Sequence, residues 1–172
     1  MTTELDWLHD PRGRLVYTGS VPAAWIDANR HMNVAWYGHV FDRGVDALWE
    51  AIGHGDEYRA QNPSTTFAVE SHARYLGEIT VDEPFAVTTR LVAVDTKRLH
   101  QFQSMWAPAA TASQRLVATC EWMHLHVDSD TRRAYKWPPE VLAVLTQLLD
   151  QQSDVPLPDS VSAAITMRRR KA

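Results

Sequence analysis

A stripe of apolar side chains at helical spacing most constrains how this chain can fold. Large apolar residues recur every three or four positions from Val34 to Ile52, which is the spacing of one face of a helix. Gly53 and Gly55 follow, as glycines commonly do at the end of a helix. The pattern therefore predicts a helix over 33–52.

The rest of the chain favours strands. A short strand is predicted from Arg14 to Val21, before the helix, and a last helix is predicted to begin at Pro138 and Pro139. Between the two helices, turn-like breaks rather than helical segments separate the β-rich runs, so these runs are expected to pair as an antiparallel sheet. The order predicts an α+β fold in which the long helix packs on the sheet. The β-rich runs are 66–79, 84–95, 98–107 and 115–127.

Composition indicates one globular domain and excludes several classes of protein. The chain has 172 residues, 45% of them hydrophobic, and we predict a single domain over 1–150 with a flexible tail over 151–172 that ends in a basic run. The net charge of -4 argues against nucleic acid as a partner. Cys120 is the only cysteine, which excludes a disulfide framework and fits a reducing compartment.

Membrane and nucleotide-loop classes are excluded on similar grounds. No apolar stretch is long enough to span a bilayer, and the N-terminal residues are acidic where a secretory signal is basic, so a cytoplasmic protein without a membrane partner is expected. With seven glycines and no G-x-G-x-x-G or Walker-type run, the chain has no glycine-rich loop for phosphates.

The loop before the long helix carries the strongest candidate site. Asp27 lies six residues before Asn33, a predicted N-cap, so its carboxylate is expected close to the N–H groups of the first helical turn. Such N–H groups stabilise an oxyanion on a carbonyl, and a carboxylate beside them can activate water or attack an acyl group. Alternatively, Asp27 and Asn33 only cap turns. His31 can polarise a carbonyl, hold a water or bond to the backbone.

A second candidate site follows from alternation in the run 66–79. If a partner subunit meets the polar face of this run, Glu70 and His72 form a site there; otherwise the face is simply solvated. The predicted apolar face holds Phe67, Val69, Ala73 and Tyr75, and the predicted polar face holds Glu70, His72 and Arg74.

Two weaker clusters complete the list of candidates. Lys97 and Arg98 form either a solvated turn or a contact for the phosphates of a ligand. His124 and His126 lie on one side of a predicted strand, but the spacing offers no third ligand, so no metal site is predicted.

These residues resemble a known family. The segment Trp25-Ile-Asp-Ala-Asn-Arg-His-Met-Asn33, followed by Tyr37, resembles the D-x-N-G-H-M-N…Y signature of hotdog-fold acyl-CoA thioesterases of the 4-hydroxybenzoyl-CoA thioesterase type. Segments 67–78, 95–100 and 121–128 resemble the branch that includes betainyl-CoA thioesterases, and the similarity spans 16–147.

The resemblance implies a long helix wrapped by a curved antiparallel sheet, and a homodimer or dimer of dimers with active sites at the subunit interface. It implies that Asp27 is the catalytic carboxylate and that N–H groups near Asn33 and Val34 form the oxyanion site. Two residues depart from the signature: Arg30 replaces the usual glycine, and Val34 replaces a second asparagine.

We therefore predict an acyl-CoA thioesterase in which Asp27 acts as general base or nucleophile and His31 and Asn33 shape the loop. No metal or organic cofactor is expected, because the thioester is already activated and coenzyme A belongs to the substrate. The alternatives are a hotdog hydratase or dehydratase acting on acyl thioesters and a non-catalytic acyl-CoA binding module. Substrate contacts are expected from Trp36, Tyr37, Glu70, His72, Lys97 and Arg98.

Tryptophan is frequent, with seven residues, and two of them flank the Asp27 loop. Trp25 and Trp36 can form an aromatic wall of an acyl pocket, against which a betaine-like quaternary ammonium would be held. Core packing is the alternative role for these rings.

Overall fold

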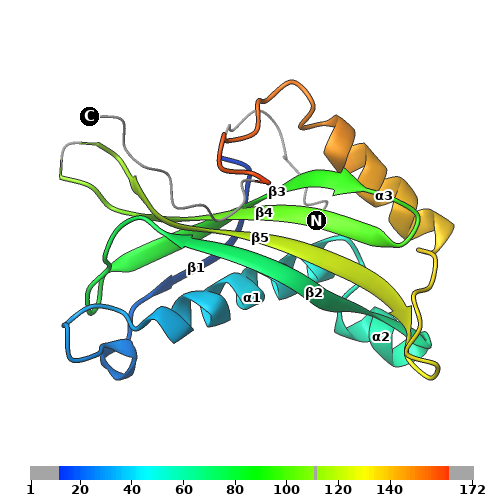
Figure 1. Ribbon diagram of the computed structural model, residues 1–172, viewed down its shortest axis with the longest axis horizontal. Coiled ribbons are helices and arrows are strands. Elements are labelled where there is room, and N and C mark those ends of the chain that lie inside the picture. Colours follow the sequence, from blue (N-terminus) through cyan, green and yellow to red (C-terminus); the bar gives the residue numbers. More distant parts are fainter. Residues whose placement is uncertain (1–11, 111, 163–172) are drawn as a thin grey trace, which may run out of the picture.

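The computed structural model describes residues 12–110 and 112–162, which form a curved sheet wrapped around a long helix (Figure 1). All neighbouring strands are antiparallel, in the order β1-β3-β4-β5-β2, so the predicted α+β architecture is confirmed. The strands are β1 (Arg14–Ser20), β2 (Ser64–Tyr75), β3 (Pro84–Val94), β4 (Arg98–Ala107) and β5 (Arg115–Asp128). The helices are the short 3-10 helix η1 (Ala23–Trp25), α1 (Val34–Ala51), α2 (Asp56–Gln61) and α3 (Pro139–Asp150).

Local chemistry sets both ends of α1. The side-chain oxygen of Asn33 accepts a hydrogen bond from the Ala35 N–H at 3.0 Å, as an N-cap does. At the other end Gly53 has a φ of 73°, and the His54 N–H donates to the Trp49 carbonyl at 2.8 Å. The helix therefore spans Val34–Ala51, close to the predicted range.

Helix α1 packs closely on the sheet at Gly44. A Cβ added there would lie 2.6 Å from Gln103 Nε2 and 3.2 Å from Val87 Cγ1, so the approach of the two elements requires glycine. The core around this contact is apolar and includes Val40, Phe41, Val87, Met105, Val117 and Ala118.

Helix α3 covers the edge of β3 that β1 leaves free. Strand β1 pairs with β3 only from Pro84 to Thr89. Beyond that point the Leu91 N–H donates to Gln152 Oε1 at 3.0 Å, so the edge is satisfied by the chain that follows α3. A second apolar core joins α1, the sheet and α3 and includes Leu48, Trp49, Leu91, Leu99, Trp137, Val141 and Leu145.

A β-bulge in β2 overturns part of the predicted alternation. The pairing of β2 with β5 shifts between Ala68 and Glu70, so Val69 is an extra residue in the strand. Phe67 therefore lies on the same face as Glu70, and its predicted place on the opposite face is wrong. Alternation alone does not predict such a shift, because the bulge depends on pairing with β5.

The chain after α3 crosses the outer face of the sheet, which is the face turned away from α1. Arg90 is 3% exposed and donates to the carbonyls of Val155 at 2.5 Å and Pro156 at 2.8 Å. The Ser162 N–H donates to Glu121 at 2.9 Å. Thus 151–162, within the predicted flexible tail, is bonded to the sheet, whereas 163–172 and the basic run lie outside the described residues.

Three local features differ from the sequence prediction. The short helices η1 and α2 were not expected, because neither has a long apolar stripe. The first run of the sheet ends at Tyr75 rather than at residue 79, because the N–H groups of Leu76 and Gly77 both donate to the Val117 carbonyl.

Within 12–110 and 112–162, no helix is long and apolar enough to cross a membrane.

Candidate active site at the N-terminus of α1

The loop between η1 and α1 holds Asp27 in a defined position. The Asp27 N–H donates to the His31 carbonyl at 3.0 Å, and the Arg30 N–H donates to the Asp27 carbonyl at 2.9 Å. The side chain is oriented as well, because Asp27 Oδ1 accepts the Asn29 N–H at 2.8 Å. Among the described residues Oδ2 has no partner, so one carboxylate oxygen remains available for chemistry.

Arg30 adopts the backbone conformation of the glycine that it replaces. Its φ is 66°, in the left-handed region that disfavours side chains. The loop therefore keeps the shape that a glycine would give it, at a cost on the order of 1 kcal/mol. The Arg30 side chain is exposed.

A cavity of about 760 Å³ lies between this loop, the start of α1 and the end of β2. It is lined by Asp27, Asn29, His31, Met32, Val34, Tyr37, Tyr75, Leu76, Gly77 and Glu78. A hollow of about 790 Å³ along α3 is of similar size, but Asp150 is the only ionisable residue lining it. Because reactive groups gather at the first cavity, we place the candidate active site there.

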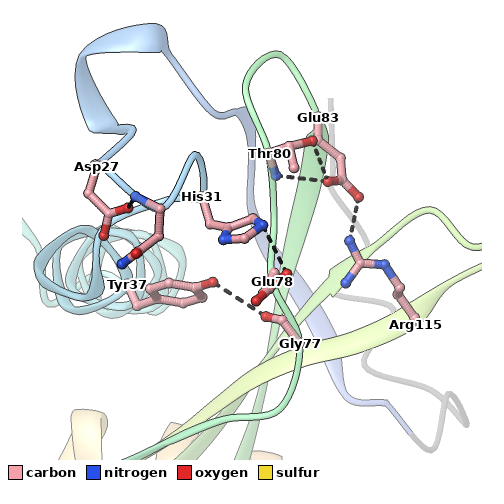
Figure 2. A network of polar contacts seen from close by, with 9 residues as sticks. Asp27, His31, Tyr37, Gly77, Glu78, Thr80, Glu83 and Arg115 are labelled. Atoms are coloured by element: carbon pink, nitrogen blue, oxygen red, sulfur yellow. Dashed lines mark hydrogen bonds and ion pairs between the residues drawn. The ribbon is translucent and has the colours of Figure 1, made fainter.

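A contact between a histidine and a glutamate closes one side of this cavity. His31 Nε2 lies 2.9 Å from Glu78 Oε2, and the two side chains are 33% and 72% exposed. Figure 2 shows the imidazole reaching from the Asp27 loop toward the chain that follows β2. The contact therefore joins two parts of the cavity wall that are distant in the sequence.

Tyr37 forms the floor of the site with Tyr75. The Tyr37 hydroxyl donates to the Gly77 carbonyl at 3.4 Å, and the two rings meet edge to face with their centroids 5.2 Å apart. Burial raises the pKa of Tyr37, although the charge of Arg115 opposes the rise. The hydroxyl therefore stays protonated at neutral pH and acts as a donor.

Behind the cavity, a separate ion pair fixes the turn between β2 and β3. Arg115 donates to Glu83 Oε1 at 2.6 Å, and the Thr80 N–H donates to Glu83 Oε2 at 3.0 Å (Figure 2). Burial alone would raise the pKa of Glu83, but these hydrogen bonds outweigh it and lower that pKa. The charge of Arg115 is thus already engaged next to the site.

The first turn of α1 faces the same cavity. Val34, its first residue, lines the cavity; the Asn33 side chain accepts the Ala35 N–H, and the Asn33 carbonyl accepts the Trp36 N–H at 3.0 Å. The positive end of the helix dipole therefore points toward the region around Asp27. The oxyanion site predicted at this helix terminus stays a prediction.

Trp36 lies beside the cavity but does not line it. Its ring stacks on that of Trp25, with centroids 4.8 Å apart and 12° between the planes. The edge of each ring also meets His39, at 5.7 Å between centroids. The facing surfaces of the two indoles are therefore covered by each other.

The other predicted substrate residues lie away from the cavity of their own chain. His72 is on the outer face, with its Nδ1 4.0 Å from Glu121 Oε1, and Glu70 is on the same face. Lys97 and Arg98 lie at the far end of the sheet, since β4 begins where β2 begins and the cavity lies where β2 ends. Arg98 is paired with Asp95 at 2.7 Å.

His124 and His126 belong to the core. His124 Nε2 bonds to Gln101 Oε1 at 2.9 Å, and His126 Nδ1 donates to the Tyr135 carbonyl at 3.1 Å. Burial lowers the pKa of His124 to about 4. Among the described residues, no group of three His, Cys, Asp or Glu side chains is placed to hold a metal ion.

Sequence reasoning gave no role to Tyr75 and Glu78, although both are in the segment that resembles the thioesterases. Their importance depends on where β2 ends, since the chain turns back at Leu76 and brings Glu78 to His31. The sequence did carry a signal: Tyr75 and Glu78 both lie within two positions of Gly77, the only glycine of that segment.

Residues 21–145 match the thioesterase-like superfamily. The chain belongs to this family. A betainyl-CoA thioesterase from Pseudomonas aeruginosa is 32% identical over 149 residues, which are 87% of this chain and 92% of that protein. The L-carnitine dehydrogenase/betainyl-CoA thioesterase of Rhizobium meliloti is 33% identical over 91% of this chain, but this chain spans only 30% of its length.

Among solved structures, a hypothetical protein from Staphylococcus aureus in complex with CoA superposes with a TM-score of 0.82 at 26% identity. The match covers 90% of this chain and 96% of that one. With family membership, this likeness confirms the hotdog fold, in which a curved antiparallel sheet wraps a long helix.

Proposed function

We propose that this chain hydrolyses an acyl-CoA thioester to CoA and a carboxylic acid in the cavity beside α1. One observation carries the proposal: the Asp27 carboxylate shares this cavity with Val34, the first residue of α1. A carboxylate and a helix N-terminus supply the two functions that the reaction needs, namely a base or nucleophile and an oxyanion site. The relatives described as thioesterases and the similar structure in complex with CoA support it.

Two routes use these groups. In the first, Asp27 takes a proton from water while the water oxygen attacks the thioester carbonyl. The α1 N-terminus stabilises the oxyanion, and its collapse breaks the C–S bond and releases the thiolate of CoA, which takes up the proton. In the second, Asp27 attacks the carbonyl and expels CoA, and water then hydrolyses the mixed anhydride to regenerate the carboxylate.

Neither route requires a metal or an organic cofactor, because the thioester is already activated. Coenzyme A thus enters only as part of the substrate. We propose betainyl-CoA as the substrate to test first, since one relative is described as a betainyl-CoA thioesterase and another as an L-carnitine dehydrogenase/betainyl-CoA thioesterase. A cytoplasmic location stays a prediction.

The free edge of the sheet supports a homodimer. Strand β2 is the edge strand beside β5, and its Val69 is 55% exposed. Long edge strands with exposed apolar residues pair readily with another strand. Such pairing would bring a second chain next to Tyr75 and the cavity, and light scattering after gel filtration measures the oligomeric state directly.

Replacing Asp27 by Asn tests the proposed chemistry. We expect Asp27→Asn to lower kcat for thiol release by about 100-fold or more, because the amide is neither a base nor a nucleophile. Asp42→Asn is the matched control, since Asp42 is exposed on α1 and does not line the cavity. Full activity of Asp27→Asn would overturn the assigned role.

The same assay separates the alternatives. If the wild-type protein releases no thiol from any acyl-CoA but hydrates an enoyl-CoA, the hydratase is correct. Binding of acyl-CoA without turnover of either kind would indicate a binding module.

A further inference from the structure

Apart from His31, the acid–base side chains that line the cavity are carboxylates and tyrosines. Asp27 and Glu78 carry carboxylates, and no lysine or arginine is among the residues that line the cavity. Arg115 lies behind Gly77, but its guanidinium donates to Glu83 at 2.6 Å and to the Pro108 carbonyl at 3.2 Å. The cavity therefore presents negative charge to whatever enters it.

Glu78 is the carboxylate that the hydrolysis does not use. It follows β2, is 72% exposed, and is oriented by His31 Nε2 at 2.9 Å. Figure 2 shows the His31 imidazole between the Asp27 loop and Glu78, and both Glu78 and Tyr37 line the cavity. Glu78 is thus held in place at the cavity wall.

The aromatic groups next to Glu78 fit a cation that has no N–H to donate. Tyr37 and Tyr75 both line the cavity, and their rings meet edge to face at 72°. A quaternary ammonium cannot form hydrogen bonds, so proteins bind it through carboxylate charge and the faces of aromatic rings. The stacked indoles of Trp25 and Trp36 are less suited, because each covers a face of the other.

We propose that Glu78 is a specificity-determining residue that selects acyl groups carrying a positive charge near the thioester, with His31 orienting it and Tyr37 and Tyr75 completing the subsite. The inference rests on the proposed hydrolysis of acyl-CoA. It deepens that function because it assigns the recognition of charge to a residue other than the catalytic carboxylate. It also predicts discrimination against anionic acyl groups.

Two thioesters of the same shape isolate the charge. Betainyl-CoA carries a trimethylammonium group, and 3,3-dimethylbutyryl-CoA carries a tert-butyl group in the same position. The measurement is kcat/KM for both with the wild type, with Glu78→Gln and with Glu57→Gln. Glu57→Gln is the matched control, because Glu57 is exposed on α2 and does not line the cavity.

We expect Glu78→Gln to lower kcat/KM for betainyl-CoA by about 5- to 30-fold and to change that for the neutral isostere by less than about 2-fold. Glu57→Gln should change neither. Added salt should reduce the wild-type preference for betainyl-CoA over the neutral isostere, because salt screens a partly exposed charge. The same ratio of kcat/KM values measured with Glu78→Gln should change little.

The outcomes distinguish this inference from the function on which it rests. If Glu78→Gln lowers kcat/KM equally for both thioesters, Glu78 only supports the loop. If it changes kcat/KM for neither thioester, Glu78 does not recognise charge. Either result overturns the inference alone. Failure of the wild type to cleave either thioester would overturn the proposed hydrolysis as well.

Discussion

The two ends of helix α1 use the same residue types in opposite ways. At the N-terminal end, His31 is partly exposed, pairs with Glu78 and lines an open cavity. At the C-terminal end, His54 is 0% exposed and packs against the rings of Trp49 and Trp137. The N-terminal end thus leaves charged groups accessible in an open cavity, whereas the C-terminal end excludes water.

The energetic consequences differ accordingly. Burial, together with the nearby His126, lowers the pKa of His54 to about 4, so the imidazole is neutral in the folded protein. The ring nitrogens of His54 and the Trp137 Nε1 have no hydrogen-bond partner among the described residues. The C-terminal end thus stabilises the fold through packing, whereas the N-terminal end holds the strained Arg30 and the charged groups of the candidate site.

Removing packing at the C-terminal end should have the largest effect on stability. We expect Trp137→Ala to lower the free energy of unfolding by about 3–5 kcal/mol, because the 3% exposed indole leaves a cavity. Urea unfolding followed by circular dichroism measures this loss, and thiol release below the transition should change little. Trp36→Ala, at the half-buried N-terminal end, is the control with a smaller expected loss. Equal losses of stability in the two variants would contradict the view that packing at the C-terminal end contributes more to the fold.

Acid should weaken the C-terminal end next. The folded pKa of His54 and of His124 is about 4, below the unfolded value of 6.5, so the unfolded chain binds more protons between these values. The stabilisation is complete above about pH 6.5 and is lost as the pH falls toward 4. At about pH 5, each histidine should lower the free energy of unfolding by about 2 kcal/mol relative to neutral pH.

Urea unfolding at about pH 7 and about pH 5 measures this loss. A His54→Phe variant removes one titrating group and keeps an aromatic ring, so its loss on acidification should be smaller than that of the wild type. Stability that does not change between the two pH values would contradict the burial of neutral histidines.

The smallest expected effect is a gain in stability at the N-terminal end of α1. Arg30→Gly should raise the free energy of unfolding by up to about 1 kcal/mol, because glycine adopts the φ of 66° without a steric penalty. The same urea experiment measures it, with Arg43→Gly in α1 as a control that should destabilise the helix. A loss of stability in Arg30→Gly would mean that the arginine side chain stabilises the loop.

Much of the fold could be predicted because its signals are local. The apolar stripe and the Asn33 cap predicted α1 closely, and the motif around Asp27 directed attention to the cavity where that residue lies. The face of Phe67 was predicted wrongly, because a bulge at Val69 arises from pairing with β5 and leaves no signal in the strand itself.

The structure brings only some of the residues predicted for the site to one cavity, and their catalytic roles stay predictions. Tyr37 lines the cavity with Asp27, whereas Lys97 and Arg98 lie at the opposite end of the sheet of the same chain. Glu78 received no role, because its contact with His31 spans two elements that only the antiparallel sheet brings together.

Local sequence signals specify the long helix, the strand order along the chain and the carboxylate loop, since periodicity, caps and turn residues act over a few positions. The tertiary structure, in contrast, sets which histidines are buried and neutral and which carboxylate lies beside His31 at the cavity. Burial and ion pairing depend on neighbours distant in sequence, and these set both the pKa of His54 and the place of Glu78.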